Sequence, residues 1–82
     1  MRLSELQTGE SAAVCQLLID GSMRRRLLDI GLVQHTMVTC VGKGPLGDPS
    51  AYRIRGAVIA LRAEDAAGVI VRPLTREDAV WD

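Results

Sequence analysis

The sequence predicts a mainly β protein with short helices, built as one small barrel of about five strands with one inserted helix. Three observations predict this fold class. The chain has 82 residues, a length typical of a single domain. Short apolar segments with period-two alternation recur along the chain and are separated by clusters of glycine, proline and aspartate. Hydrophobic residues make up 48% of the chain, a share too high for a disordered segment.

The first elements along the chain are a turn and a strand. Residues 3–10, LSELQTGE, predict a short turn or single helical turn that leads into a strand. That strand covers residues 11–19, SAAVCQLLI. Within it, Ala13, Cys15 and Leu17 fall on one side and the intervening residues on the other. We expect both faces of this strand to be partly covered.

Residues 21–32, GSMRRRLLDIGL, predict a helix over residues 23–30. Ser22 is a suitable N-cap because its hydroxyl can accept a hydrogen bond from a free N–H of the first turn. Gly31 suits the left-handed position just past a helix end, from which the next leucine can fold back onto the helix. The apolar stripe of this helix consists of Met23, Leu27 and Ile30.

The three consecutive arginines in this helix are not explained by the stability of the helix itself. They occupy its positive N-terminal turn, and Asp29 lies near its negative end; each such placement costs about 0.3–1 kcal/mol when exposed. Arg25 and Asp29 are four residues apart in the weaker order of charges. We expect Arg24 and Arg25, with Leu28 on the flank of the apolar stripe, to face either water or an acidic partner surface.

The second half of the chain predicts the remaining strands and one exposed loop. Its expected strands are residues 36–41, 51–55, 58–62 and 68–74, with one helical turn at residues 63–67. The segment 42–49, GKGPLGDP, is rich in glycine and proline and predicts a rigid loop. Leu46 at its tip cannot easily reach the core. We therefore expect Leu46 to be a contact residue, in an apolar patch shared with Leu28 or with a second copy of the chain.

Five short strands and one early helix are typical of a small barrel of the SH3-like kind. We expect this barrel to span residues 1–74 and to be followed by a tail at residues 75–82, which has no clear period. The only aromatic residues are Tyr52 and Trp81, so an aliphatic core is expected. The two cysteines, Cys15 and Cys40, are expected to be reduced and buried in the core.

The balance of charges and the scarcity of metal-binding and catalytic residue types exclude several classes of function. Ten basic residues balance ten acidic ones, so we expect no nucleic-acid partner, because such binding needs an excess of Lys and Arg. No uncharged run is long enough to span a bilayer and no apolar signal core is seen, which predicts a cytoplasmic protein without membrane insertion. The single histidine, His35, lacks a nearby nucleophile and companion ligands. We expect no catalysis and no resident cofactor or metal, although weak binding of Fe²⁺ or Zn²⁺ stays open.

Several motifs occur together in a fixed order: LSEL, GSMRRRLLDIGL, PLGDP and a late ALR followed by alanine. In this order they resemble the FeoA family over residues 3–71. The resemblance implies an SH3-like barrel with an inserted helix. It also implies an accessory or regulatory role in bacterial ferrous-iron uptake, through binding to the cytoplasmic GTPase part of the transporter FeoB. The partner-binding residues expected on these motifs are Arg24, Arg25, Leu28, Leu46 and Asp48.

The chain departs from the family pattern at two places. The family usually has Pro-Gly before the second strand, where this chain has QHT, and this puts His35 at an exposed turn. Val58 and Ala60 stand where polar residues facing water are expected, so one barrel edge is apolar and favours a homodimer. An alternative function also stays open: a stand-alone SH3-like module, related to the C-terminal domain of iron-dependent repressors, that binds another protein or a transition metal.

Overall fold

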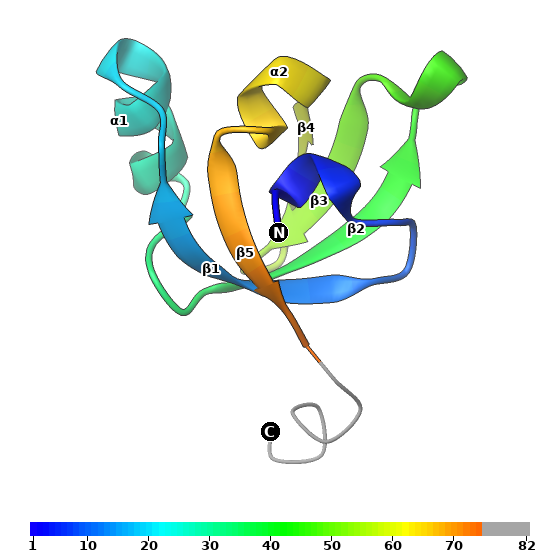
Figure 1. Ribbon diagram of the computed structural model, residues 1–82, viewed down its shortest axis with the longest axis horizontal. Coiled ribbons are helices and arrows are strands. Elements are labelled where there is room, and N and C mark those ends of the chain that lie inside the picture. The colour runs from blue at the N-terminus through cyan, green and yellow to red at the C-terminus, as the bar shows by residue number, and fades with distance from the viewer. Residues whose placement is uncertain (75–82) are drawn as a thin grey trace.

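Five antiparallel strands form one curled sheet in the computed structural model, which describes residues 1–74 (Figure 1). The order of the strands in the sheet is β4-β3-β2-β1-β5. The strands are β1 (Ser11–Leu17), β2 (Met37–Lys43), β3 (Ser50–Ile54), β4 (Ala57–Leu61) and β5 (Val69–Pro73). The helical elements are η1 (Leu3–Glu5), α1 (Gly21–Asp29), η2 (Pro45–Gly47) and α2 (Ala63–Ala66). The predicted mainly β fold with one early inserted helix is confirmed, and the predicted tail at residues 75–82 lies outside the described residues.

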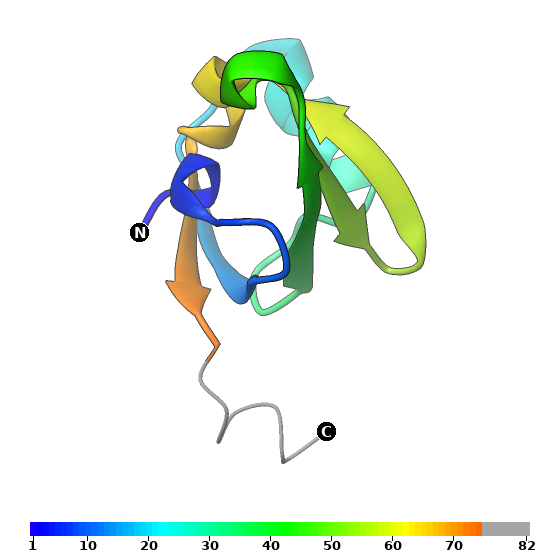
Figure 2. The ribbon, with the colours of Figure 1, turned by 90° about the vertical axis from the view of Figure 1, so that its right-hand side faces the viewer.

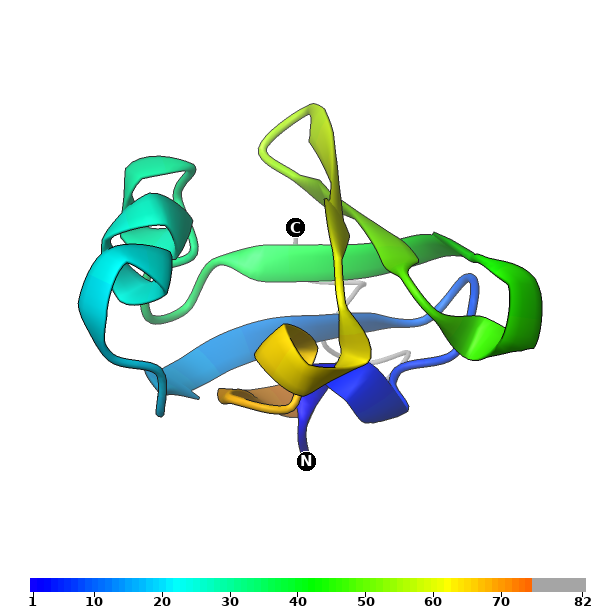
Figure 3. The same cartoon turned by 90° about the horizontal axis from the view of Figure 1, so that it is seen from above.

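The helical elements lie around the rim of the curled sheet. α1 lies at one end of the long strands β1 and β2, and η2 lies at the other end (Figures 1 and 3). The hairpin formed by β3 and β4 projects from the body of the barrel (Figure 2). The two ends of the barrel therefore carry different surfaces, and each has its own short helical element.

The core is formed by the inward faces of all five strands together with residues from α1, α2 and the N-terminal segment. Its members are Leu3, Leu6, Ala12, Val14, Leu27, Leu32, Val38, Cys40, Tyr52, Ile54, Leu61, Ala66, Val69 and Val71. The expectation of a purely aliphatic core is wrong, because Tyr52 is the largest fully buried side chain. Tyr52 lies between buried Ser50 and Ile54 on β3, so the period of two turns it inward. Its hydroxyl donates a hydrogen bond to the Leu3 carbonyl oxygen at 3.4 Å.

The C-terminus of α1 ends as the sequence predicts. Gly31 has a φ of +101°, a left-handed conformation that glycine adopts without steric cost. The Gly31 N–H donates to the Leu28 carbonyl oxygen and the Leu32 N–H donates to the Leu27 carbonyl oxygen, which is the Schellman pattern. Leu27 and Leu32 are both fully buried. The motif therefore directs the chain back into the core and fixes α1 against the barrel.

Two local predictions in the first half of the chain are wrong. Ser22 is not the N-cap, because α1 begins at Gly21 after Asp20, and no side chain caps this end. Cys15 is exposed rather than buried, whereas Cys40 is buried as expected; both thiols are free. The reason is that Ala12 and Val14 face the core, so the alternation of faces along β1 directs Cys15 outward. A bulge in the pairing of β1 with β5 lies between Val14 and Gln16, and Gln16 is exposed as well.

We predict that Tyr52 makes the stability of the fold depend on alkaline pH. Burial raises the pKa of Tyr52 above its ordinary value of 10.0, against a smaller lowering by a hydrogen bond with Ser50. The folded state therefore holds the phenol proton more tightly than the unfolded state. This contribution is fully present below pH 10.0 and is lost as the pH rises through the folded-state pKa.

The measurement is the free energy of unfolding against pH for the wild-type protein and for Tyr52→Phe. The wild-type protein should lose stability more steeply above pH 10.0. Parallel curves for the two proteins would contradict the assignment. The chain has one tyrosine, so the ultraviolet absorption of its phenolate reports the titration of this side chain alone.

Candidate functional site

The arginines of α1 differ in what they contact. The Arg24 guanidinium donates a hydrogen bond to the Leu17 carbonyl oxygen at 3.0 Å, so it fastens α1 to the end of β1. The Arg25 Nε lies 3.9 Å from the Asp29 Oδ1, and the Arg25 side chain is 83% exposed. An exposed pair of this kind contributes little to stability, typically below about 1 kcal/mol. Arg25 is therefore accessible to a partner, whereas Arg24 is already engaged in the fold.

A hollow of about 280 Å³ lies between α1, the end of β1 and the turn that follows α1. It is lined by Val14, Cys15, Gln16, Leu17, Arg24, Leu28, Leu32, Val33 and Gln34. Leu28 and Val33 are both exposed large apolar side chains. We call Arg24, Arg25, Leu28 and Val33 together the α1 face. Sequence reasoning missed Val33, although its position directly after the helix-ending Gly31–Leu32 pair was a usable signal.

The loop that contains η2 forms a second, different surface. Leu46 is fully exposed, as the sequence predicts. Its backbone adopts a left-handed φ of 60°, a conformation that is uncommon for residues other than glycine, asparagine and aspartate. Leu46 is held outward by the backbone and contributes nothing to the core.

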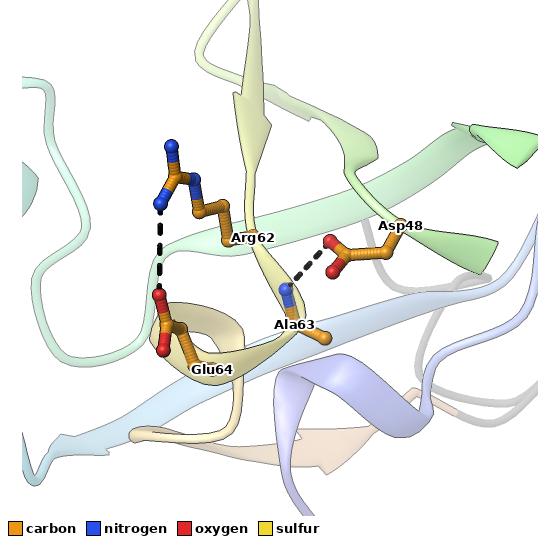
Figure 4. A network of polar contacts seen from close by, with 4 residues as sticks. All are labelled: Asp48, Arg62, Ala63 and Glu64. Atoms are coloured by element: carbon orange, nitrogen blue, oxygen red, sulfur yellow. Dashed lines mark hydrogen bonds and ion pairs between the residues drawn. The ribbon is translucent and has the colours of Figure 1, made fainter. Parts of the chain in front are cut away.

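Asp48 has a structural partner within the chain. Its Oδ1 accepts a hydrogen bond from the Ala63 N–H at 2.9 Å, at the start of α2 (Figure 4). This contact satisfies one of the free N–H groups that every helix N-terminus leaves. Nearby, the Arg62 Nη1 and the Glu64 Oε1 lie 3.8 Å apart. Asp48 therefore joins the η2 loop to α2, in addition to any role toward a partner.

The predicted partner-binding residues form two groups rather than one. Arg24, Arg25 and Leu28 belong to α1, whereas Leu46 and Asp48 belong to the η2 loop. α1 and η2 lie at opposite ends of the barrel in both views (Figures 1 and 3). The expected patch shared by Leu46 and Leu28 in one chain is therefore wrong, because the length of β2 separates the two elements.

We predict that Leu46→Ala leaves stability almost unchanged, because the side chain it shortens is fully exposed. Exposed substitutions away from special contacts usually change the free energy of unfolding by less than about 0.5 kcal/mol. Leu32→Ala is the matched control, because Leu32 is fully buried and such a change costs about 2–5 kcal/mol. Thermal unfolding of the two variants gives the comparison. A large drop in the melting temperature for Leu46→Ala would show that Leu46 belongs to the core.

His35 lies at an exposed turn, as predicted, with a left-handed φ of 74°. It lines a shallow hollow of about 430 Å³ with Gln34, Thr36, Met37 and Arg55. Within residues 1–74, no group of three His, Cys, Asp or Glu side chains is placed to hold a metal ion. In the same part of the chain, no helix is long and apolar enough to cross a membrane.

The comparisons with known proteins agree with this architecture. The model of the FeoA domain family matches residues 1–73. The FeoA/FeoB fusion protein of Porphyromonas gingivalis, a joined Fe²⁺ transport protein A and Fe²⁺ transporter, is 44% identical over 71 residues. The match covers 87% of this chain and 8% of the fusion protein, so this chain spans a small part of that relative's length.

Solved structures show the same fold. FeoA of Chlorobium tepidum matches with a TM-score of 0.86 and 36% identity, covering 92% of this chain and 71% of that one. FeoA of Stenotrophomonas maltophilia, described as a prokaryotic SH3 domain protein in complex with zinc, matches with a TM-score of 0.78 and 35% identity, covering 87% and 88%. The SH3-like class predicted for the barrel is therefore confirmed.

A more distant likeness concerns the fold alone. A manganese-dependent transcriptional repressor matches with a TM-score of 0.79 and 19% identity, covering 90% of this chain and 41% of the repressor. The barrel thus also occurs within a larger regulatory protein. The match of the family model to residues 1–73 and the identity of 44% to a FeoA-containing relative rest on sequence as well as fold. On this evidence the chain belongs to the FeoA domain family.

Proposed function

We propose that this protein is a cytoplasmic accessory protein of bacterial ferrous-iron uptake and that it binds the GTPase part of a FeoB-like transporter. The observation that carries this proposal is the P. gingivalis relative, in which Fe²⁺ transport protein A and the transporter FeoB form one polypeptide. Joining two domains in one chain maintains a high effective concentration of each near the other. A FeoA domain that is not joined to FeoB needs a surface that achieves the same association by affinity.

The α1 face is the surface that we assign to this association. Leu28 and Val33 offer apolar area at the hollow, and the exposed Arg25 lies three residues before Leu28 on α1, on a neighbouring row of the helix surface. Arginine beside an apolar centre is a composition enriched at protein–protein interfaces. The Arg24–Leu17 hydrogen bond and the Schellman motif fix α1 against the barrel. The face is therefore pre-organised, which lowers the entropy lost on binding.

The side chains of the α1 face favour a binding role over a catalytic one. The hollow is lined mainly by aliphatic side chains and amides, with Arg24 as its charged member. Such a lining suits an apolar segment with an acidic neighbour on a partner protein. We therefore assign the protein a regulatory contact with the transporter, with no chemical step of its own.

The test of this function is direct binding to the isolated GTPase part of the FeoB transporter from the same organism. Titration calorimetry should show a saturable complex, and its affinity should fall as salt screens the arginine contact. A GTPase domain of unrelated function serves as the control. Absence of binding to the transporter domain, or equal binding to both domains, would contradict the proposal.

We also infer that the protein holds no resident metal and binds Fe²⁺ or Zn²⁺ only weakly. A tight zinc site normally uses three or four protein ligands, and residues 1–74 bring no three suitable side chains together. Titration with Zn²⁺ should therefore give a weak, non-stoichiometric signal. A stoichiometric sub-micromolar site that disappears in His35→Ala would overturn this prediction and favour the metal-binding alternative.

A further inference from the structure

The two edges of the sheet are treated differently by the chain. The outer edge of β5 is covered by the N-terminal segment, through a bridge between Arg2 and Ile70 and a hydrogen bond from the Val71 N–H to the Met1 carbonyl oxygen at 2.7 Å. The outer edge of β4 pairs with no strand in residues 1–74. Each copy of the described barrel therefore has one covered sheet edge and one open sheet edge.

The open edge exposes the backbone groups of two residues. β3 and β4 are joined by a two-residue turn, Arg55 and Gly56, with φ values of 51° and 82°. Such a hairpin is closed by a hydrogen-bonded pair, here Ile54 with Ala57. Because hydrogen-bonded pairs alternate along an antiparallel ladder, Val58 and Ala60 direct their N–H and C=O groups away from β3.

β4 lacks the features that usually protect an open edge. Natural edges are blunted by charged side chains, prolines or bulges. The strand Ala57–Leu61 has the sequence AVIAL, and its pairing with β3 has no shift in register. The Val58 side chain is 56% exposed and Ala60 is also exposed. The edge is therefore free of bulges, uncharged and apolar, which favours pairing with another strand.

We propose that two copies of this protein pair through β4, antiparallel about a twofold axis near Val58, to form one continuous sheet. A second copy fits this edge because AVIAL places no charge opposite itself. The nearest basic residue beside Val58 is Arg53 on β3. In the pair, the two copies of Arg53 stand three strand spacings apart, roughly 14 Å, which exceeds the Debye length of about 8 Å at physiological salt.

The position of α1 explains why the axis lies near Val58. A hollow of about 410 Å³ is lined by Met23 and Arg26 of α1 together with Ala60 and Leu61 of β4. α1 therefore lies next to the C-terminal half of β4. The N-terminal half belongs to the projecting hairpin (Figure 2), and at the hairpin turn the Arg55 side chain reaches back to Gly31 at the end of α1. A second hairpin has access to the strand at this projecting half.

The single open edge also limits the size of the assembly. An interface that uses the same patch on both copies closes at two. Because the β5 edge is already covered, no further copy can add to the sheet. A pair of five-residue strands buries less than the roughly 1,200 Å² of a standard stable interface, so we expect a weak dimer that dissociates on dilution.

Hydrogen exchange measured at several protein concentrations tests the proposal in the full chain. The Val58 amide should exchange rapidly in dilute protein and become protected, by about tenfold or more, as concentration rises. The Ala57 and Ile59 amides pair with β3 and should be protected throughout. Sedimentation equilibrium on the same samples should show the matching rise in mass. A monomer at all concentrations, or a dimer without new protection at Val58, would overturn the proposal.

Substitutions at Val58 distinguish pairing through the β4 edge from nonspecific association. Val58→Pro removes the outward N–H and leaves the ladder with β3 intact, because proline is tolerated at such an edge position. Val58→Lys places a charge at the edge and replaces the proline variant in the experiment if that variant fails to fold. Both should abolish the dimer. Leu18→Lys is the matched control, because Leu18 is 57% exposed and lies outside β4; it should dimerise normally. A dimer that persists in Val58→Lys, or protection that appears only when the FeoB GTPase part is added, would contradict the second copy as occupant.

Discussion

Replacing Leu27 by alanine is expected to lower the free energy of unfolding by about 2–5 kcal/mol. Leu27 is the fully buried residue of α1, and its removal leaves a cavity where α1 meets the barrel. A chain of 82 residues has a total stability of roughly 4–12 kcal/mol. The substitution therefore removes a large share of the stability, and the measurement is urea-induced unfolding at equilibrium.

The matched control for this experiment is the neighbouring residue on the same helix. Leu28 is exposed, so Leu28→Ala should cost well under the value for Leu27→Ala. Both changes have the same helix propensity effect, which therefore cancels in the comparison. Equal losses for the two variants would mean that α1 is seated on the barrel differently from the arrangement described above.

Reversing the charge and polarity of the α1 face is expected to weaken binding to the FeoB GTPase part by about ten- to a hundredfold. The variant combines Arg25→Glu with Leu28→Glu, which removes the accessible guanidinium and the apolar side chain beside the hollow. Arg24 is left unchanged because its guanidinium bonds to the Leu17 carbonyl oxygen. A change at Arg24 would therefore mix a loss of fold with a loss of binding.

The control for the α1 face makes the same two chemical changes elsewhere. The control variant combines Arg53→Glu, which reverses the charge of an exposed arginine on β3, with Leu46→Glu, which makes an exposed leucine on the η2 loop polar. This variant should bind nearly as well as the wild-type protein, and both variants should unfold at similar temperatures. Equal weakening by the two variants would mean that nonspecific charge, rather than the α1 face, determines the affinity.

The parts of the fold that depend on local sequence could be predicted. Gly31 followed by a leucine defines how α1 ends, and the structure confirms the left-handed φ of +101° at this glycine. The glycine- and proline-rich segment places Leu46 outside the core, also as expected. Both predictions rest on backbone conformations that only a few residue types adopt, so a single sequence carries the signal.

Other parts of the fold depend on contacts between distant segments. The bulge between Val14 and Gln16 arises in the pairing of β1 with β5, and no local pattern announces it. The hydrogen-bond partner of the buried Tyr52 hydroxyl, the Leu3 carbonyl oxygen, is also far from it in the sequence. Because these partners are far apart in the sequence, a pattern of neighbouring residues cannot predict either feature.

The candidate site shows the same division. The outward positions of Arg25 and Leu28 follow from helical spacing alone. The bond from Arg24 to β1 and the role of Asp48 at the start of α2 required the three-dimensional structure, because each joins elements that a linear pattern treats separately. Only the folded chain separates the α1 face from the η2 loop, and this separation makes the two surfaces independently testable.

The measurement that tests the central claim most directly is a nuclear magnetic resonance titration of the isotope-labelled protein with the FeoB GTPase part. The account predicts that the changed resonances belong to the α1 face, at Arg25, Leu28 and Val33 and the neighbouring end of β1. Resonances of the η2 loop at Leu46 should stay unchanged. Changes confined to the η2 loop, or no saturable change anywhere, would contradict the assignment of the α1 face as the docking surface.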